Sequence, residues 1–498
     1  MQTQSEELRF LLKHSTIYGL GNVLSRAVAF LMLPLYTHYL TPTDYGMLEL
    51  LETTTGLIGI VAGLGISASV SRFYYERETE PERQRLISTV FLTIGFGTSG
   101  LLVFAHLAAP LLAWLVLNDR AYAWYFQLAF INLLLGVFVD VGLSYLRMLY
   151  KSVLFITLST LTLVVGVTLN VIFISQLHYG VLSILYTSFI VRIMVGVPLT
   201  ASILKRNGVR YSLSDARALL RYSLPILPAT LGNALLNYSD RYFIKSFVSL
   251  ADAGVYGLAN KVGSILHTLI TGPFISTFQP RRFQLAHERA DVKQVLQTVF
   301  DSFFLVLLSL SLIVAIYSRD VMMMMTAPAF HAAADLIPVL LLANLLFAMK
   351  YHVDFGIFQS GKTQYYMWAN VMTAAVQLTA AFFLIRAFGM WGAAYAIVLS
   401  TTVNVILLHA FANRLYPIDF NFGRCLRTLA FAILVYLTAA HRFTDDVTLT
   451  LLLKTASVAA YLVLLPVLGL ISREELHQAL ALTRSFIKRV PIPSAARS

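Results

Sequence analysis

The sequence predicts an all-α membrane protein with many transmembrane helices. Of its 498 residues, 58% are hydrophobic and only 12% are charged, and the mean hydropathy is +0.72. Soluble globular chains are about 25% charged and about 45–50% apolar, so this composition excludes an ordinary soluble enzyme or binding domain. The apolar runs are long and lack the alternating pattern of barrel strands, so they predict helices rather than a β-barrel.

These runs predict fourteen membrane-spanning helices. At about 1.5 Å per residue, some 20 apolar residues cross a hydrocarbon layer of roughly 30 Å. An even number of crossings places both chain ends on the same side of the membrane. The expected spans are residues 15–40, 46–70, 86–109, 121–146, 152–174, 180–204, 223–248, 254–279, 294–317, 335–359, 364–385, 391–413, 425–441 and 447–471.

The charged residues predict which side of the membrane holds the chain ends. The chain has 37 Lys and Arg against 25 Asp and Glu, a net charge of +12. Most of the basic residues fall in one set of alternate loops, including 72–85, 205–221 and 281–293, and loops rich in Lys and Arg stay in the cytoplasm. Both termini are therefore expected to be cytoplasmic. Anionic lipid headgroups account for the excess charge, so we expect membrane lipids and no nucleic acid as partners.

The spans predict five regions along the chain. Residues 1–204 are expected to form an N-terminal lobe of six helices, and residues 223–414 a C-terminal lobe of six more. Between them, 205–222 contains LSDARALLRYSLP, a pattern typical of an amphipathic helix on the inner membrane surface. Residues 415–471 hold the last two helices, and 472–498 are expected to be a cytoplasmic tail.

The first expected span, Ser15–Leu40, carries a polar stripe. Asn22, Ser25 and Arg26 share one helix face, because their spacing is i, i+3 and i+4. A guanidinium near mid-depth costs about 2.5–3.5 kcal/mol by insertion scales, so Arg26 is expected to avoid lipid. Two interpretations stay open: Arg26 pairs with an acidic residue of a neighbouring helix, or it lines an anion-binding cavity. Because Glu6 precedes a run too long for a signal peptide, this helix is expected to remain in the mature protein.

Further basic and polar residues lie within other spans. Asn233, Asn237 and Arg241 form a similar stripe in the seventh span, and Arg192 lies midway along the sixth. The planar guanidinium of arginine can bind two oxygens of an anion at once, so Arg192 and Arg26 are the first candidates for anion contacts. The full set of candidate substrate-binding residues is Arg26, Arg192, Arg241, Lys261, Lys350, Asn22, Asn233 and Asn237.

Three acidic residues within spans are candidates for ion coupling. Glu49 and Glu52 lie one turn apart in the second span, and Asp140 lies in the fourth. A carboxylate in a partly dry cavity can take up a proton, and such carboxylates could also coordinate sodium. The alternative is that they only neutralise Arg26 and Arg192.

The spans contain as many acidic as basic residues, so a purely structural network of ion pairs is also open. Asp354 lies one turn from Lys350 and could neutralise it. Lys454 is near enough to a membrane face for its ammonium group to reach water, so we expect it to have no role in a site.

Several residues recur at a separation of about 210 positions, which predicts a duplicated half. Leu20-Gly21-Asn22 returns as Leu231-Gly232-Asn233, and Asp44 with Gly46 returns as Asp252 with Gly254. Both acidic residues follow a Ser or Thr by three positions, which is typical of a helix N-terminus. Since each repeat has an even number of crossings, the two lobes are expected to be related by an axis along the membrane normal.

The LGN and arginine of the first span, the turn LTPTDYG from Leu40 to Gly46, the basic loop after it and the fourteen spans resemble the polysaccharide transporters (Wzx type) of the multidrug/oligosaccharidyl-lipid/polysaccharide exporter superfamily. The resemblance covers essentially the whole chain. It implies a flippase in the bacterial inner membrane that moves an undecaprenyl-diphosphate-linked oligosaccharide from the cytoplasmic to the periplasmic leaflet, for O-antigen or exopolysaccharide biosynthesis. It also implies alternating access between the two lobes, and a polysaccharide polymerase complex as a further partner.

Two other classes stay open at this point. A cation-coupled multidrug exporter of the same superfamily is the first, although arginines at depth disfavour a cationic substrate. A membrane glycosyltransferase or polymerase is the second, but the short outer loops leave little room for catalytic carboxylates. No histidine cluster, phosphate-binding glycine loop or nucleophile triad is recognisable, so we expect a transporter rather than an enzyme, with no cofactor and with coupling to protons or sodium.

Overall fold

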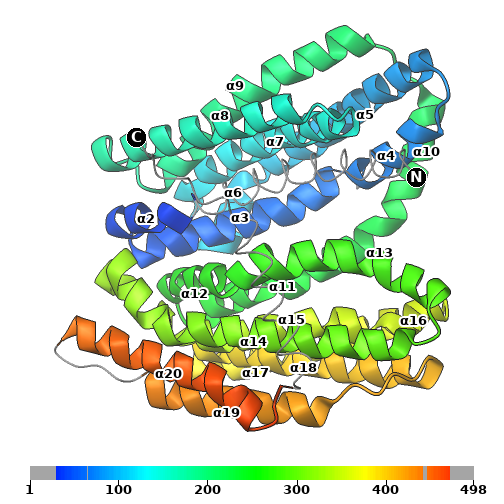
Figure 1. Cartoon of the computed structure of the whole chain (residues 1–498). Helices are drawn as coiled ribbons and strands as arrows, with labels where there is room; N and C mark the ends of the chain where they lie inside the picture. The colour runs from blue at the N-terminus through cyan, green and yellow to red at the C-terminus, as the bar shows by residue number, and fades with distance from the viewer. Residues whose placement is uncertain (1–27, 29, 64–65, 441–445, 472–498) are drawn as a thin grey trace, which may run out of the picture. The chain divides into compact units, whose positions relative to one another are not determined.

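The computed structural model describes residues 28, 30–63, 66–440 and 446–471. These residues form helices, and no β-strand occurs among them, which confirms the predicted all-α class (Figure 1). The α-helices are α2 (Leu33–Tyr39), α3 (Pro42–Ala62), α4 (Ile66–Glu76), α5 (Glu80–Leu107), α6 (Ala109–Leu117), α7 (Ala123–Met148), α8 (Ser152–Val171), α9 (Val181–Asn207), α10 (Leu213–Ser223), α11 (Leu227–Phe247), α12 (Leu250–Gly263), α13 (Gly272–Glu288), α14 (Val292–Met325), α15 (Ala333–Val353), α16 (Phe355–Gln359), α17 (Gln364–Phe388), α18 (Met390–Leu415), α19 (Phe422–Ala439) and α20 (Val447–Val467).

Ten helical segments of the described chain are long and apolar enough to cross a membrane. They coincide with the third to sixth and the ninth to fourteenth predicted spans, so a multi-pass membrane protein is confirmed. Most of the first predicted span lies outside the described residues. The seventh corresponds to α11, which is less apolar because it contains Asp240, Arg241 and Lys245. The total of fourteen spans stays a prediction.

Two of the predicted spans are not single helices. The span predicted at 46–70 is divided between α3, which ends before Gly63, and α4, which begins at Ile66. Glycine is a poor helix former because its backbone loses the most conformational freedom on folding. The span predicted at 254–279 is interrupted by a π-helical turn, His267–Thr271, which ends two residues before Pro273. Because proline has no N–H to donate, the regular bonding pattern of the helix changes there.

The predicted start signals of α3 and α12 are confirmed. The backbone N–H of Asp44 donates to the hydroxyl of Thr41 at 3.1 Å, and the N–H of Thr41 donates back to the Asp44 carboxylate at 3.0 Å. The N–H of Asp252 likewise donates to the hydroxyl of Ser249 at 3.0 Å. These bonds satisfy backbone donors that have no partner inside the first turn, and they fix where both helices begin.

The described chain divides into two compact units. The first runs to Leu258 and also includes 325–331 and 381–393. One part of its core packs α4, α5, α7, α9 and α10 together around residues such as Val90, Phe91 and Leu219. A second part joins α3, α5, α6 and α7 around Leu50 and Phe126. The first unit therefore contains α11 and most of α12 in addition to residues 1–204.

The amphipathic helix predicted within 205–222 is present as α10. Its Leu219 is fully buried against α4 and α5, whereas Leu213 is largely exposed. Asp215 in its first turn is buried and accepts a hydrogen bond from Arg77 at 2.7 Å. The apolar face of α10 and the ion pair between Asp215 and Arg77 thus hold the helix against α4, α5 and their connection.

The second unit contains 259–324, 332–380 and the chain from Ala394 onward. Aromatic residues gather at one end of its core, where Phe274, Phe278, Phe300 and Phe303 pack around the buried side chain of His352. This packing joins α13, α14 and the α15–α16 connection.

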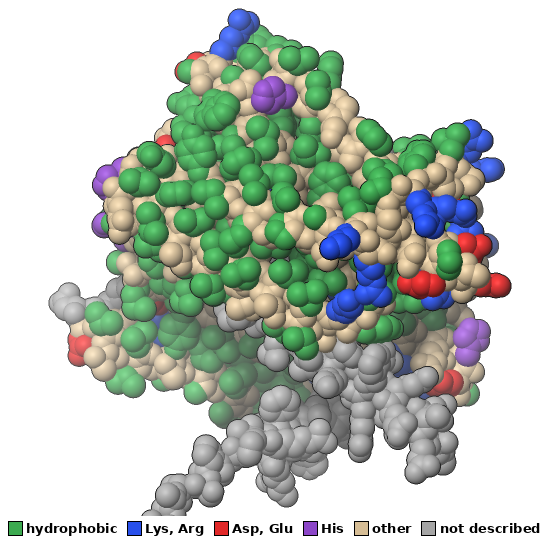
Figure 2. Space-filling model, turned by 90° about the horizontal axis from the view of Figure 1, so that it is seen from above, with side chains coloured by type: hydrophobic (Ala, Val, Ile, Leu, Met, Phe, Trp, Pro, Cys, Tyr) green, Lys and Arg blue, Asp and Glu red, His purple; other side chains and the backbone are tan. Residues whose placement is uncertain are grey.

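One face of the molecule is suited to lipid. In Figure 2, hydrophobic side chains are spread over the visible face, and most of the visible Lys and Arg side chains lie toward the right. The helix α8 contributes to such a surface, because Val153, Leu161 and Val164 are exposed. A large exposed apolar surface is unfavourable in water and favourable in a hydrocarbon layer.

Candidate functional site

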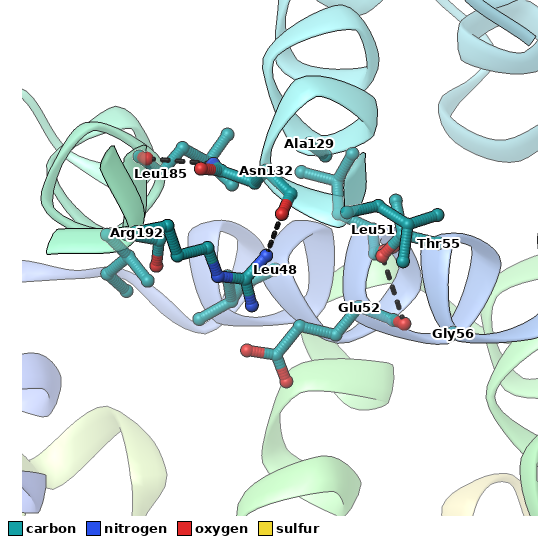
Figure 3. Close-up of a pocket in the computed structure, with 12 residues that line it drawn as sticks. Leu48, Leu51, Glu52, Thr55, Gly56, Ala129, Asn132, Leu185 and Arg192 are labelled. Carbon is teal, nitrogen blue, oxygen red and sulfur yellow. Dashed lines mark hydrogen bonds between the residues drawn. The ribbon is translucent and has the colours of Figure 1, made fainter. Parts of the chain in front are cut away.

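The cavity best suited to bind a ligand lies in the first unit and has a volume of about 340 Å³. It is bounded by one face of α3 and by facing parts of α7 and α9 (Figure 3). Two residues predicted for the site, Arg192 and Glu52, lie on its wall. The lining residues are Leu48, Leu51, Glu52, Thr55, Gly56, Ala129, Asn132, Leu133, Ile184, Leu185, Ser188 and Arg192.

Arg192 is held at the cavity wall by the backbone of α7. Its Nη1 donates a hydrogen bond to the carbonyl oxygen of Asn132. Gly136, one turn further along α7, leaves room for the guanidinium, since a Cβ at that position would lie 2.8 Å from Nη1. Within the described part of the chain, Arg192 forms no ion pair with a carboxylate. The arrangement orients a cationic group toward the cavity without neutralising it.

Asn132 supports this position and was not singled out in the sequence. Its Nδ2 donates to the carbonyl oxygen of Leu185 at 2.9 Å, which ties α7 to α9 beside Arg192. The amide side chain is 4% exposed. A polar residue in the middle of the fourth predicted span was the available signal for its importance.

Two of the three candidate coupling acids lie near Arg192. Glu52 projects from α3 on the cavity side, and Figure 3 shows its carboxylate on the side where the Arg192 guanidinium lies. Asp140 is two turns after Asn132 on α7, and its side chain is exposed. It acts electrostatically on Arg192 without forming an ion pair with it. Arg192 and these two carboxylates therefore lie in one region without forming an ion pair.

The third acid, Glu49, does not line the cavity and belongs to a buried cluster of charged side chains. Nε of Arg241 donates to the Glu49 carboxylate at 3.2 Å, and Nη1 of Arg241 donates to Asp240 at 2.9 Å. The hydroxyl of Tyr256 donates to the second oxygen of Asp240 at 2.6 Å. The side chains of Arg241, Glu49 and Asp240 are 5%, 5% and 1% exposed. In this conformation Arg241 therefore contacts protein carboxylates rather than a cavity.

The other predicted substrate contacts are distributed as follows. Asn22 and Arg26 lie outside the described residues. Asn233 and Asn237 lie on α11, and their side chains are not described. Lys261 is exposed near the end of α12. Lys350 lies on α15 with its ammonium nitrogen 3.9 Å from the centre of the Phe347 ring.

The ion pair considered between Asp354 and Lys350 is wrong. Asp354 accepts a hydrogen bond at 2.6 Å from Nη1 of Arg282, and the two side chains are only 1% and 2% exposed. Arg282 belongs to α13, whereas the sequence predicts a cytoplasmic loop for residues 281–293. Because α13 continues past Pro280 as a helix, it brings Arg282 into the protein interior.

The expectation that the Lys454 ammonium group reaches a membrane face is also wrong. Its side chain is fully buried rather than extended to a membrane face, and its ammonium group donates to the Asp320 carboxylate at 2.6 Å. This bond joins α20 to α14. No group of histidine, cysteine or acidic side chains suited to a metal ion occurs in the described ranges.

A family model described as "Polysaccharide biosynthesis protein" matches residues 11–286. A curated relative, the succinoglycan biosynthesis transport protein ExoT of Rhizobium meliloti (strain 1021), is 26% identical over 274 residues. That alignment covers 54% of this chain and 52% of the relative, so the match spans about half the length of ExoT.

Two solved structures show the fold. The lipid II flippase MurJ in an inward closed conformation has a TM-score of 0.70 at 11% identity, covering 91% of this chain and 97% of MurJ. An inward-facing multidrug resistance transporter of the MATE family has a TM-score of 0.63 at 14% identity, covering 80% of this chain and 97% of that one. The family match covers more than half of the chain. The related transport protein and the shared fold are consistent with a cavity that holds Arg192 among apolar helices. The chain therefore belongs to the polysaccharide biosynthesis protein family.

Proposed function

We propose that this chain is a flippase that moves an undecaprenyl-diphosphate-linked oligosaccharide from the cytoplasmic to the periplasmic leaflet of the bacterial inner membrane. The family, a relative named for succinoglycan transport and a fold shared with a lipid II flippase support this proposal. The delivered oligosaccharide would then serve a polymerase in cell-surface polysaccharide biosynthesis. Both chain termini are cytoplasmic in this proposal.

The position of Arg192 is the observation that carries the proposal. A diphosphate presents several anionic oxygens, and a guanidinium aimed into a cavity can bind two of them with parallel hydrogen bonds. Within the described chain Arg192 forms no ion pair with a carboxylate, so an anionic ligand would gain a partner instead of displacing one. Ser188 of α9 can donate a hydrogen bond to a phosphate oxygen, and Glu52 of α3 can accept hydrogen bonds from sugar hydroxyls.

The cavity volume also fits a headgroup site rather than an enclosed site for a whole substrate. About 340 Å³ is at the lower end of the range for small-molecule sites. It can hold a phosphorylated headgroup with the first part of a sugar, while the polyprenyl tail stays in lipid beside the apolar surface. Alternating access between the regions 1–204 and 223–414 would then carry the headgroup across.

The test is the leaflet in which the lipid-linked sugar accumulates. In cells that lack the chain, we expect the lipid-linked oligosaccharide to be protected from a membrane-impermeant glycosidase added from the periplasmic side. The wild-type chain should restore access, and Arg192→Ala should not. Arg147→Ala is the matched control, because Arg147 lies on the last turn of α7 and outside the cavity. Equal access in cells with and without the chain would contradict the proposal.

The same experiment separates two alternatives. Glu52 on the cavity wall favours a cation-coupled multidrug exporter, a class that shares the fold. Such an exporter predicts loss of resistance to toxic cations and no change in the leaflet of the lipid-linked sugar. A glycosyltransferase or polymerase predicts that the sugar reaches the periplasmic leaflet but is not extended.

A further inference from the structure

The first turns of α3 and α12 touch backbone to backbone at two glycines. A Cβ on Gly46 would lie 1.9 Å from the carbonyl oxygen of Leu250, and a Cβ on Gly254 would lie 2.1 Å from that of Pro42. Real side chains cannot approach so closely, so only glycine fits at either position. Small residues of this kind allow two membrane helices to reach their closest approach.

This contact is reciprocal. Leu250 precedes Gly254 by four positions, and Pro42 precedes Gly46 by four. Each glycine therefore meets the carbonyl at the corresponding position of the other helix, which is the pattern of a two-fold relation. The same glycines, with Asp44 and Asp252, are equivalent in the sequence repeat. The contact thus joins matching points of the two repeats.

One turn further along, the two repeats differ, and an ion pair between Glu49 and Arg241 joins α3 to α11. The repeat position equivalent to Glu49 is Gly257, and a Cβ on Gly257 would lie 2.5 Å from Cγ of Glu49. The absent side chain of Gly257 makes the space that Glu49 fills. From there the Glu49 carboxylate accepts the hydrogen bond of Arg241, which Asp240 also holds. Thr54, further along α3, is 2.8 Å from the hydroxyl of Tyr242 on α11.

We propose that the Gly46–Gly254 contact and the Glu49–Arg241–Asp240 cluster form a releasable closure beside the cavity, and that transport requires the closure to separate. Glu49 of the cluster lies one helical turn before Glu52, which lines the cavity. A permanent contact of this kind would be served better by apolar packing, because buried ion pairs barely repay their desolvation. Charged partners can instead be solvated again when the helices part. This inference rests on the proposed transport function.

The first test measures whether the closure opens. Cys425 is the only cysteine of the chain, so Cys425→Ser gives a cysteine-free background. Thr54→Cys in that background reports on the closed contact, because Thr54 is 7% exposed. We expect Arg241→Ala to speed labelling of this cysteine by an impermeant thiol reagent about tenfold or more, since each 1.4 kcal/mol lost from the closed state is about tenfold in its population. Lys245→Ala, also on α11, should leave the rate unchanged.

A second variant tests the glycine contact. Gly254→Ala places a methyl group against the backbone of α3, and it should also speed the labelling of Thr54→Cys. Gly100→Ala is the matched control, because a Cβ there meets nothing within 4 Å. Labelling that stays at the wild-type rate in both Arg241→Ala and Gly254→Ala would overturn the proposal.

A cross-link tests the same closure without altering Glu49, Arg241 or Asp240. Thr54→Cys and Tyr242→Cys, joined by a short reducible bifunctional reagent, should stop transport, and reduction should restore it. Cross-linked protein that transports at the normal rate would also overturn the proposal. Because labelling needs no substrate, a faster label in Arg241→Ala would stand even if the lipid-linked sugar proved not to be the cargo.

Discussion

The guanidinium of Arg192 packs directly against Gly136 of the facing helix α7. The guanidinium of Arg192 occupies the space where a Cβ of residue 136 would be, 2.8 Å from its Nη1, and from there it reaches the carbonyl oxygen of Asn132. The cationic group of the cavity therefore depends on a missing side chain on the facing helix. This dependence allows the position of Arg192 to be tested separately from its charge.

Gly136→Ala should displace Arg192 and impair transport while leaving the arginine in place. Crowding of a packed site costs about 1–3 kcal/mol, which corresponds to a loss of roughly 5- to 150-fold in affinity for the headgroup. The measurement is the rate at which the lipid-linked sugar becomes accessible on the periplasmic side. Gly166→Ala should have no effect, because a Cβ there meets nothing within 4 Å. Normal transport in Gly136→Ala would show that the exact position of Arg192 is unimportant.

Arg192→Lys should impair transport although it keeps the charge. Lysine cannot form two parallel bonds to a diphosphate, and its ammonium group is not oriented by the Asn132 carbonyl in the same way. A hydrogen bond to a charged group is worth about 1.5–3 kcal/mol, so we expect a loss of roughly 10- to 100-fold. Arg192→Ala should lose more. A lysine variant that matches the wild type in the same assay would reduce Arg192 to a point charge.

Glu52→Gln and Asp140→Asn test ion coupling. If these carboxylates bind the driving proton or sodium ion, each variant should lose the response of transport to that gradient. Vesicles with an imposed pH or sodium gradient provide the measurement, and Asp119→Asn, a helix cap outside the cavity, is the control. If the acids only balance Arg192, the variants should keep the gradient response and change only substrate affinity. Transport that ignores both gradients in the wild type would exclude coupling altogether.

Arg282→Ala should destabilise the second unit, whereas Lys350→Met should not. Removal of Arg282 leaves the Asp354 carboxylate buried without its ion-pair partner, and breaking such a pair costs about 3–5 kcal/mol. Thermal unfolding of the detergent-solubilised protein measures the difference. Lys350 rests on the Phe347 ring, and methionine can keep that packing. A lower stability for Lys350→Met than for Arg282→Ala would contradict this assignment of the pair.

The sequence by itself determined the class of fold, because long apolar runs have only one way to satisfy their backbone groups in lipid without closing a barrel. It also determined the starts of α3 and α12, since the bonds of Thr41 with Asp44 and of Ser249 with Asp252 span three residues and need no distant partner. Arg192 and Glu52 could be selected from the sequence because charges within apolar spans are unfavourable unless they have a role.

Only the tertiary structure decided which charges meet. Glu49 and Glu52 are one turn apart in the sequence, yet one binds Arg241 in a buried cluster and the other faces the cavity with Arg192. Arg282 was assigned to a loop, and it is the partner of Asp354 in the interior. The physical reason is that an ion pair depends on distances of a few ångströms between side chains far apart in the chain, and helix packing sets those distances.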